Sequence, residues 1–291
     1  MRCALPFVAL LGACTATPLA ARREHPNIVS LNPCSDAILG EVADPAQILA
    51  ISSYSQDPRA TSMPLGQAWR FRSTSGSAEE VLALAPDVVV ASQFLAPATR
   101  QAIARLGVRV QTVGAPATVA QSEDQVRQLA RLAGHPERGE RLVARIEGAL
   151  AAARTSARRL TALLWQPGGI VAGPDTLAAE LLRRTGFVSQ SAARGLGQGA
   201  YLPLEQVLAD PPQVILAAGS ERMLTHPVLR GLEGVRYERL DPALVYCGGP
   251  TIVRAAHRLA EIRATASLPP VGGGRGGLIS THPPATGRGE A

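Results

Sequence analysis

Two short segments of the chain carry nearly the same sequence. EEVLALAPDVVV covers residues 79–90 and EQVLADPPQVIL covers residues 205–216, with six of the twelve positions identical. Each copy has glutamate where a helix begins, then a proline that the helix cannot continue past, then a short apolar run typical of a buried strand. The sequence therefore predicts one helix–turn–strand unit that is built twice, provided that the surrounding elements also correspond.

The elements around the two copies do correspond. The first half opens with a predicted strand at 28–31 and a helix over 35–42, and the second with a strand at 160–165 and a helix over 176–184 that Gly186 terminates. Further strands are predicted at 47–51, 108–113 and 235–240. Because strands alternate with helices, we predict an α/β fold with parallel sheets.

A long amphipathic helix is predicted between the halves. Its apolar residues recur at helical spacing after Pro136, and we expect it to run to about Arg158 as a rigid connection. A chain of 291 residues, 46% of them apolar, is long enough for two cores. We expect an N-terminal lobe at 27–134, an interlobe helix at 135–159 and a C-terminal lobe at 160–267.

The two ends of the chain do not resemble the interior. Residues 1–21 combine Arg2, an apolar stretch and small residues, a pattern typical of an export signal, and Leu11-Gly12-Ala13-Cys14 resembles a bacterial lipobox. Either Cys14 becomes a lipidated first residue, or cleavage occurs near Ala20 or Ala21. Residues 268–291 are rich in Pro and Gly, and we expect a disordered tail. The location expected from these features is the periplasm.

The positive charge of the chain does not indicate a nucleic-acid partner. The net charge is +6, but all 29 basic residues are arginines and they are scattered. Basic runs interleaved with aromatic residues, which nucleic-acid binding favours, are missing from the sequence. We interpret the charge as a solvated, arginine-rich surface.

The order of these features resembles a known family. The export signal, SLNPCSD after the first strand, SYSQDP after the second, the two repeated units and the long central helix together resemble the solute-binding proteins of ABC importers for cobalamin, haem and ferric siderophores. The resemblance covers about residues 27–266. It implies two Rossmann-like lobes joined by the long helix, a ligand cleft between them, no cofactor, no enzymatic activity, and a monomer that delivers its ligand to an inner-membrane permease and ATPase.

The resemblance assigns docking residues. Members of the family present a glutamate from each lobe to arginines of the permease, and the repeated unit places these roles on Glu79 and Glu205. The alternative is that both residues only stabilise the positive ends of their helices. Glu80, which suits a capping box that begins at Ser77, is the alternative docking residue of the first lobe.

Candidate ligand contacts lie after the predicted strands, because ligands of open parallel sheets bind outside the carboxyl ends of the strands. We expect Tyr54, Gln93, Trp165, Tyr201 and Tyr246 to contact the ligand. Aromatic rings suit a broad chelate with apolar faces. Each ring taken singly is also compatible with ordinary packing, and Trp165 in particular ends a strand that a core would bury.

Cys34 and Cys247 are the remaining ligand-site candidates. The resemblance places them in loops on facing sides of the cleft, where they form a disulfide, contact the metal of the ligand as thiolates, or stay as inert thiols. We favour free thiols, since a bridge between the lobes would oppose opening.

The identity of the ligand is less defined. Haem binders of the group carry a tyrosine ligand in the loop before the first repeated helix, whereas this chain has RFRSTS at 70–75. Cobalamin binders of the group often carry a tryptophan in the same loop, but Trp69 lies several residues before that position. Arg70 and Arg72 suit carboxylates or phosphate on a ligand, or a solvated loop. A corrinoid and a ferric siderophore both remain candidate ligands.

Two other classes of protein compete with this interpretation. A zinc or manganese importer component needs histidines that converge on a metal, but His25 precedes the fold and His135 begins a helix, so we expect no metal site. An exported enzyme that uses Cys34 as nucleophile would need a paired base. GxSxG, HExxH, P-loop and GxGxxG motifs are all missing from the sequence.

Overall fold

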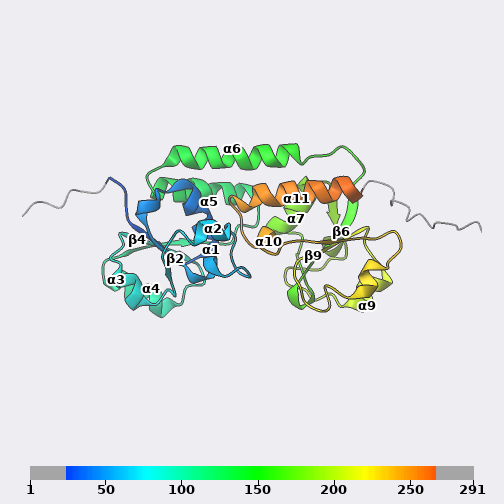
Figure 1. Ribbon diagram of the computed structural model, residues 1–291, viewed down its shortest axis with the longest axis horizontal. Helices are drawn as coiled ribbons and strands as arrows, with labels where there is room; N and C mark the ends of the chain where they lie inside the picture. Colours follow the sequence, from blue (N-terminus) through cyan, green and yellow to red (C-terminus); the bar gives the residue numbers. More distant parts are fainter. Residues whose placement is uncertain (1–23, 267–291) are drawn as a thin grey trace, which may run out of the picture.

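The computed structural model describes residues 24–266, which form two lobes side by side beneath one long helix (Figure 1). The predicted export signal with Cys14 and the predicted tail at 268–291 lie outside the described residues. None of the helices in the described part has the length and hydrophobicity needed to span a bilayer.

The N-terminal lobe is built on a parallel sheet of five strands. These are β1 (Ile28–Ser30), β2 (Ile48–Ser52), β3 (Ser73–Thr74), β4 (Val88–Ser92) and β5 (Arg109–Val113). Their spatial order is β3-β2-β1-β4-β5, with Ile28 opposite Val88 in the β1–β4 pair. Val29, Ala50 and Val89 face one core of this lobe, and Ile28, Ile51 and Val88 face the other. A sheet that is buried on both faces explains the continuous apolar runs.

The C-terminal sheet repeats this arrangement. Its strands are β6 (Leu160–Gln166), β7 (Ile170–Val171), β8 (Phe187–Ser189), β9 (Val214–Ala217) and β10 (Arg236–Arg239). β10 pairs with β9, β9 with β6, and β6 with both β7 and β8. The order β10-β9-β6-β8 matches β5-β4-β1-β2, so the repeated units end in equivalent strands, β4 and β9. The predicted parallel pairing is correct except that β7 is antiparallel to β6.

The helices cover both faces of the sheets. The α-helices are α1 (Pro33–Val42), α2 (Leu65–Ala68), α3 (Ala78–Ala83), α4 (Pro97–Arg105), α5 (Val119–Leu132), α6 (Pro136–Ala152), α7 (Leu177–Arg184), α8 (Gln190–Ala193), α9 (Leu204–Ala209), α10 (Ala243–Tyr246) and α11 (Thr251–Ala266). The 3-10 helices are η1 (Pro45–Gln47), η2 (Ser53–Gln56), η3 (Pro167–Gly169) and η4 (Pro227–Arg230). In the repeated units, α3 precedes β4 and α9 precedes β9.

The connecting helix α6 is shorter than predicted. It has 17 residues and ends at Ala152 rather than near Arg158. The segment RTSARR at 154–159 has no large apolar side chain to extend the buried face, which explains the early end. At 1.5 Å per residue, α6 is about 26 Å long.

α6 does not join the lobes alone. It packs against α1 and α5 of the N-terminal lobe and against α11, which runs beside it (Figure 1). One hydrophobic cluster continues from Ile28 and Leu39 through Leu142 and Ile146 of α6 to Ile252 of α11. The two lobes therefore share a core beneath the connecting helix, and this shared core fixes their relative position.

Candidate functional site

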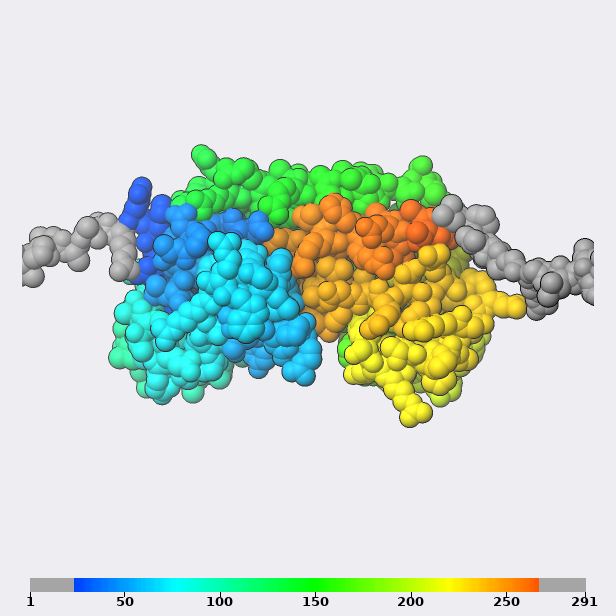
Figure 2. Space-filling model, in the orientation of Figure 1, coloured from blue at the N-terminus to red at the C-terminus, as the bar shows by residue number. Residues whose placement is uncertain are grey.

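A groove separates the two lobes on the side away from α6 (Figure 2). One wall comes from the N-terminal lobe, the other from the segment around residues 200–235, and the region after residue 240 lies above them. The predicted ligand contacts lie after β1, β2 and β4 in one lobe, and at the end of β6, before α9 and after β10 in the other.

Large aromatic side chains are exposed in these loops. The exposed fractions are 63% for Tyr54, 65% for Trp69, 80% for Phe94, 59% for Tyr201 and 45% for Tyr246. Tyr54 follows β2, Phe94 follows β4, Tyr246 follows β10, and Tyr201 is bridged to Ile170 at the start of β7. These five rings are half of the ten aromatic residues in the chain. We call them the exposed aromatics.

Two further predicted contacts differ in their placement. Gln93 is exposed in the loop after β4. Trp165 is fully buried in the core of the C-terminal lobe, where its indole Nε1 donates a hydrogen bond to the Leu202 carbonyl at 3.1 Å. A ligand in the groove would contact Trp165 only if that core unpacked. Trp165 therefore packs in the core, and the expected ligand contact is not present. Trp69 is instead the tryptophan that faces solvent.

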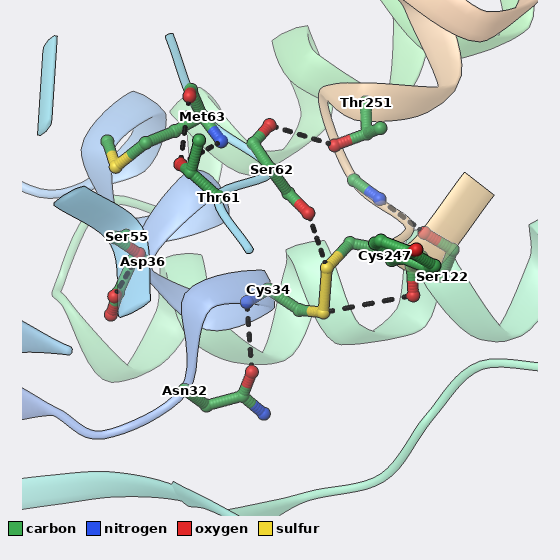
Figure 3. The surroundings of a disulfide bond; sticks show 12 residues. Asn32, Cys34, Asp36, Ser55, Thr61, Ser62, Met63, Ser122, Cys247 and Thr251 are labelled. Atoms are coloured by element: carbon green, nitrogen blue, oxygen red, sulfur yellow. Dashed lines mark hydrogen bonds between the residues drawn. A yellow bond between two sulfur atoms is a disulfide. The ribbon is translucent and has the colours of Figure 1, made fainter. Parts of the chain in front are cut away.

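Cys34 and Cys247 form a disulfide between the lobes (Figure 3). Their Cα atoms lie 5.2 Å apart, Cys34 lies in the first turn of α1, and Cys247 follows α10. The predicted free thiols are therefore wrong, and a cystine has no thiolate to offer a metal. Asn32 caps α1 by accepting a hydrogen bond from the Cys34 amide at 2.9 Å, which fixes the loop that carries the bridge.

Other contacts already hold the lobes together beside the bridge. The Gly249 amide donates to the Ser122 hydroxyl at 2.7 Å, and the Thr251 hydroxyl donates to the Ser62 carbonyl at 3.3 Å. A Cβ atom at Gly248 would lie 2.2 Å from the Ser122 hydroxyl oxygen, so only glycine permits this approach. Free thiols were expected because a bridge between the lobes would oppose their opening. The hydrogen bonds described above already join the lobes beside the bridge, so the disulfide does not oppose an opening motion at this place.

Asp36 is a buried carboxylic acid beside this seam (Figure 3). One carboxyl oxygen accepts hydrogen bonds from the Ser52 amide at 2.9 Å and the Ser55 hydroxyl at 2.6 Å, while Oδ1 has no partner among the described residues. Burial raises the pKa of Asp36 to about 7, although hydrogen bonds from Ser30, Ser55 and Ser52 oppose the shift. Asp36 therefore changes charge near neutral pH.

Replacing Asp36 with asparagine is expected to flatten the pH dependence of stability. The folded state holds its proton up to about pH 7 and the unfolded chain only to about 3.8, so wild-type stability falls as pH rises between these values. The loss over this window is on the order of 4 kcal/mol at 1.4 kcal/mol per pKa unit. Urea unfolding at several pH values measures it. Asp175→Asn, at an exposed site, is the control; parallel curves for wild type and Asp36→Asn would contradict the expectation.

The two predicted docking glutamates are exposed in the first turns of α3 and α9. These helices lie on the side of the molecule opposite α6 (Figure 1). Neither Glu79 nor Glu205 forms an ion pair or side-chain hydrogen bond within the described part of the chain. Both carboxylates are therefore available at the surface.

Glu80 has a different environment from Glu79. Its carboxylate accepts hydrogen bonds from the Thr74 hydroxyl at 2.6 Å and the Ser75 amide at 2.8 Å, which lower its pKa. The predicted capping box is half present: the Ser77 hydroxyl accepts from the Glu80 amide, but the Glu80 carboxylate binds the preceding loop instead of the Ser77 amide. Glu80 thus organises the start of α3, which leaves Glu79 as the available carboxylate of the first unit.

Sequence comparison agrees with this architecture. A family profile described as periplasmic binding protein matches residues 28–240. The chain belongs to this family. A search of curated protein sequences finds no match. Membership supports a solute-binding role of the kind that serves ABC importers, and the predicted family resemblance is confirmed.

Solved structures with the same fold extend the comparison. The periplasmic haem-binding protein RhuT from Roseiflexus is 23% identical, with a TM-score of 0.64 over 83% of this chain and 98% of that one. The haem-binding protein HutB of Vibrio cholerae is 16% identical (TM-score 0.67, 81% and 98% covered). The vitamin B12-binding protein BtuF of Vibrio cholerae is 19% identical (TM-score 0.64, 83% and 98% covered). At these identities the likeness concerns the two-lobed fold.

Proposed function

We propose that this periplasmic binding protein captures a metal chelate, a corrinoid or a ferric siderophore, in the groove and delivers it to an inner-membrane permease with its ATPase. The chain would be exported to the periplasm and act as a monomer without enzymatic turnover. The observation that carries the proposal is the set of exposed aromatics: five rings that are 45–80% exposed and come from both lobes, with Tyr246 next to the disulfide that joins the lobes. Exposed apolar surface gathered in one region is typical of a binding site.

The chemistry of the groove favours a ligand that brings its metal already coordinated. The disulfide removes both thiols as metal ligands. Burial raises the pKa of the Tyr246 hydroxyl, and the nearby charges of Asp241 and Glu221 add to the shift, which disfavours the phenolate that ferric iron prefers. Aromatic rings with neutral hydroxyl edges instead suit stacking on a flat or broad chelate.

Haem is the second candidate. RhuT and HutB, which share the fold of this chain, are haem-binding proteins. The loop at 70–75 nevertheless lacks the tyrosine that the family uses as haem ligand, and Arg72 and Ser73–Ser75 occupy that region beside Glu80. We therefore rank haem behind a corrinoid and a ferric siderophore.

Three probes test the proposal: cyanocobalamin, a ferric hydroxamate siderophore and haemin. Trp69 is exposed and Trp165 is buried, so quenching of tryptophan fluorescence by a bound chelate reports mainly on Trp69, and Trp69→Phe should remove most of the signal. We expect saturable quenching by one of the first two probes. Replacing Tyr54 and Tyr246 with alanine should weaken that affinity about 10- to 100-fold, since a buried aromatic contact contributes about 1–3 kcal/mol.

Leu106→Ala is the matched control, because Leu106 is 63% exposed but follows α4 outside the groove. Its affinity for the probe should equal that of the wild type. Tight binding of haemin alone would favour the second candidate. Failure of all three probes, or conversion of the bound chelate into a product, would contradict the proposal.

A further inference from the structure

A cluster of potential metal ligands lies at the edge of the N-terminal sheet opposite the groove. His25 precedes β1, Asp44 lies between α1 and β2, and His135 is the N-cap residue of α6. One potential ligand atom from each of the three lies within 4.8 Å of the others. The two imidazole rings are in contact, with centroids 4.4 Å apart. All three residues lie near the amino ends of strands, whereas the groove loops follow their carboxyl ends.

The spacing of the donor atoms matches that of ligands around one ion. His135 Nε2 lies 3.1 Å from Asp44 Oδ2. Zinc bonds of 2.0–2.1 Å in a tetrahedron place neighbouring ligand atoms about 3.3 Å apart. His135 Nε2 also lies 3.0 Å from Gln47 Oε1, so a further oxygen donor adjoins the cluster. These atoms are already arranged closely enough for shared coordination.

Neighbouring residues hold the three side chains in place. Arg138 donates a hydrogen bond to Asp44 Oδ1 at 2.7 Å, which leaves Oδ2 directed at His135. Outer hydrogen bonds of this kind orient metal ligands in proteins. The His25 ring rests on Gly134, where a Cβ atom would come within 2.2 Å of His25 Nδ1. Position 134 must therefore be glycine for the ring to lie here, and its φ of 82° also favours glycine.

We propose that His25, Asp44 and His135 bind one divalent transition-metal ion of the zinc class. Two imidazoles with one carboxylate suit Zn²⁺, Ni²⁺ or Cu²⁺, whereas Ca²⁺ and Mg²⁺ prefer all-oxygen sites. The half-buried side chains leave the ion a path from solvent. The site would tie the segment before β1 to the start of α6, apart from the chelate groove. The sequence-based expectation of no metal site rested on His25 preceding the fold and His135 beginning a helix, yet the fold brings the two side chains into contact.

The proposal is tested by zinc titration of metal-free protein that carries no polyhistidine tag. Competition with a chromophoric chelator measures the affinity, and His282→Ala in every sample removes the histidine that lies outside the described residues. We expect one zinc ion per chain. His25→Ala and Asp44→Asn should each weaken binding at least about tenfold, the lower limit seen when only an outer partner of a metal ligand is lost. Mg²⁺ should not compete.

His257→Ala, at an exposed histidine of α11, is the control and should bind zinc as the wild type does. Zinc should also raise the melting temperature of the wild type but not of His25→Ala, because a ligand stabilises the state that binds it. His25 lies at the start of the fold, so its replacement leaves the core intact. Equal zinc affinity in His25→Ala and the wild type, or failure of the wild type to bind zinc, overturns the proposal.

Discussion

Replacing both Cys34 and Cys247 with alanine is expected to lower the free energy of unfolding by about 3 to 5 kcal/mol. The bridge joins residues 213 positions apart and so restricts a very long loop in the unfolded chain. The chain-entropy relation gives about 5 kcal/mol for such a loop, at the upper end of measured disulfide contributions. Urea unfolding of the oxidised wild type and the double variant measures the difference.

Wild-type protein that is unfolded and refolded in reductant is the matched control, since it keeps both side chains but lacks the bond. It should have the stability of the double variant. Mass measurement before and after reduction should show the gain of two hydrogen atoms for the pair. Identical unfolding curves for oxidised wild type and double variant would show that the bridge does not stabilise the lobes.

Reversing the charge of both Glu79 and Glu205 to arginine is expected to abolish uptake of the ligand while the affinity for the ligand stays unchanged. The two carboxylates are exposed in the first turns of α3 and α9, and neither forms an ion pair or side-chain hydrogen bond within the described part of the chain. If they meet arginines of the permease, reversal creates like-charge contacts that cost several kcal/mol at an interface. Transport into cells or proteoliposomes that contain the cognate permease measures the effect.

The matched control is Glu137→Arg, because Glu137 is also exposed in the first turn of a helix but belongs to α6 on the opposite side of the molecule. Like each substitution of the double variant, Glu137→Arg removes a favourable interaction between a carboxylate and a helix N-terminus. Normal uptake in this control together with no uptake in the double variant would support docking. Normal uptake in the double variant would eliminate both glutamates as docking residues.

The architecture was predictable because the repeat spans whole elements. The apolar run that ends the second repeated unit forms β9 as expected, and the other predicted strands shift by one or two residues at their ends. β3, β7 and β8 were missed, because strands of two or three residues show no periodic pattern and these three lack the long apolar runs of the central strands. The over-extension of α6 arose because arginine and alanine suit a helix wherever packing permits one.

The site was less predictable, because it depends on which way a side chain faces and on distances between distant segments. The rule that ligands bind beyond the carboxyl ends of parallel strands applies equally to Tyr54 and Trp165. Side chains alternate between the two faces along β6, however, and this alternation places Trp165 in the core with Leu163. Nothing in the sequence states that Cys34 and Cys247 lie within bonding distance. The same holds for His25 and His135, which are 110 positions apart, and for Asp36, since an aspartate is exposed by default.

The elements that join the two lobes include some of the last residues of the described chain. Cys247 and α11 supply the bridge and the last layer against α6, and both follow nearly all of the other described elements. A polypeptide that emerges from its amino terminus first presents Cys34 and the apolar side of α6 long before their partners exist. The native structure can therefore form only after the final helix has been synthesised. If synthesis or export stops before that point, the chain remains incompletely folded, with apolar surface exposed.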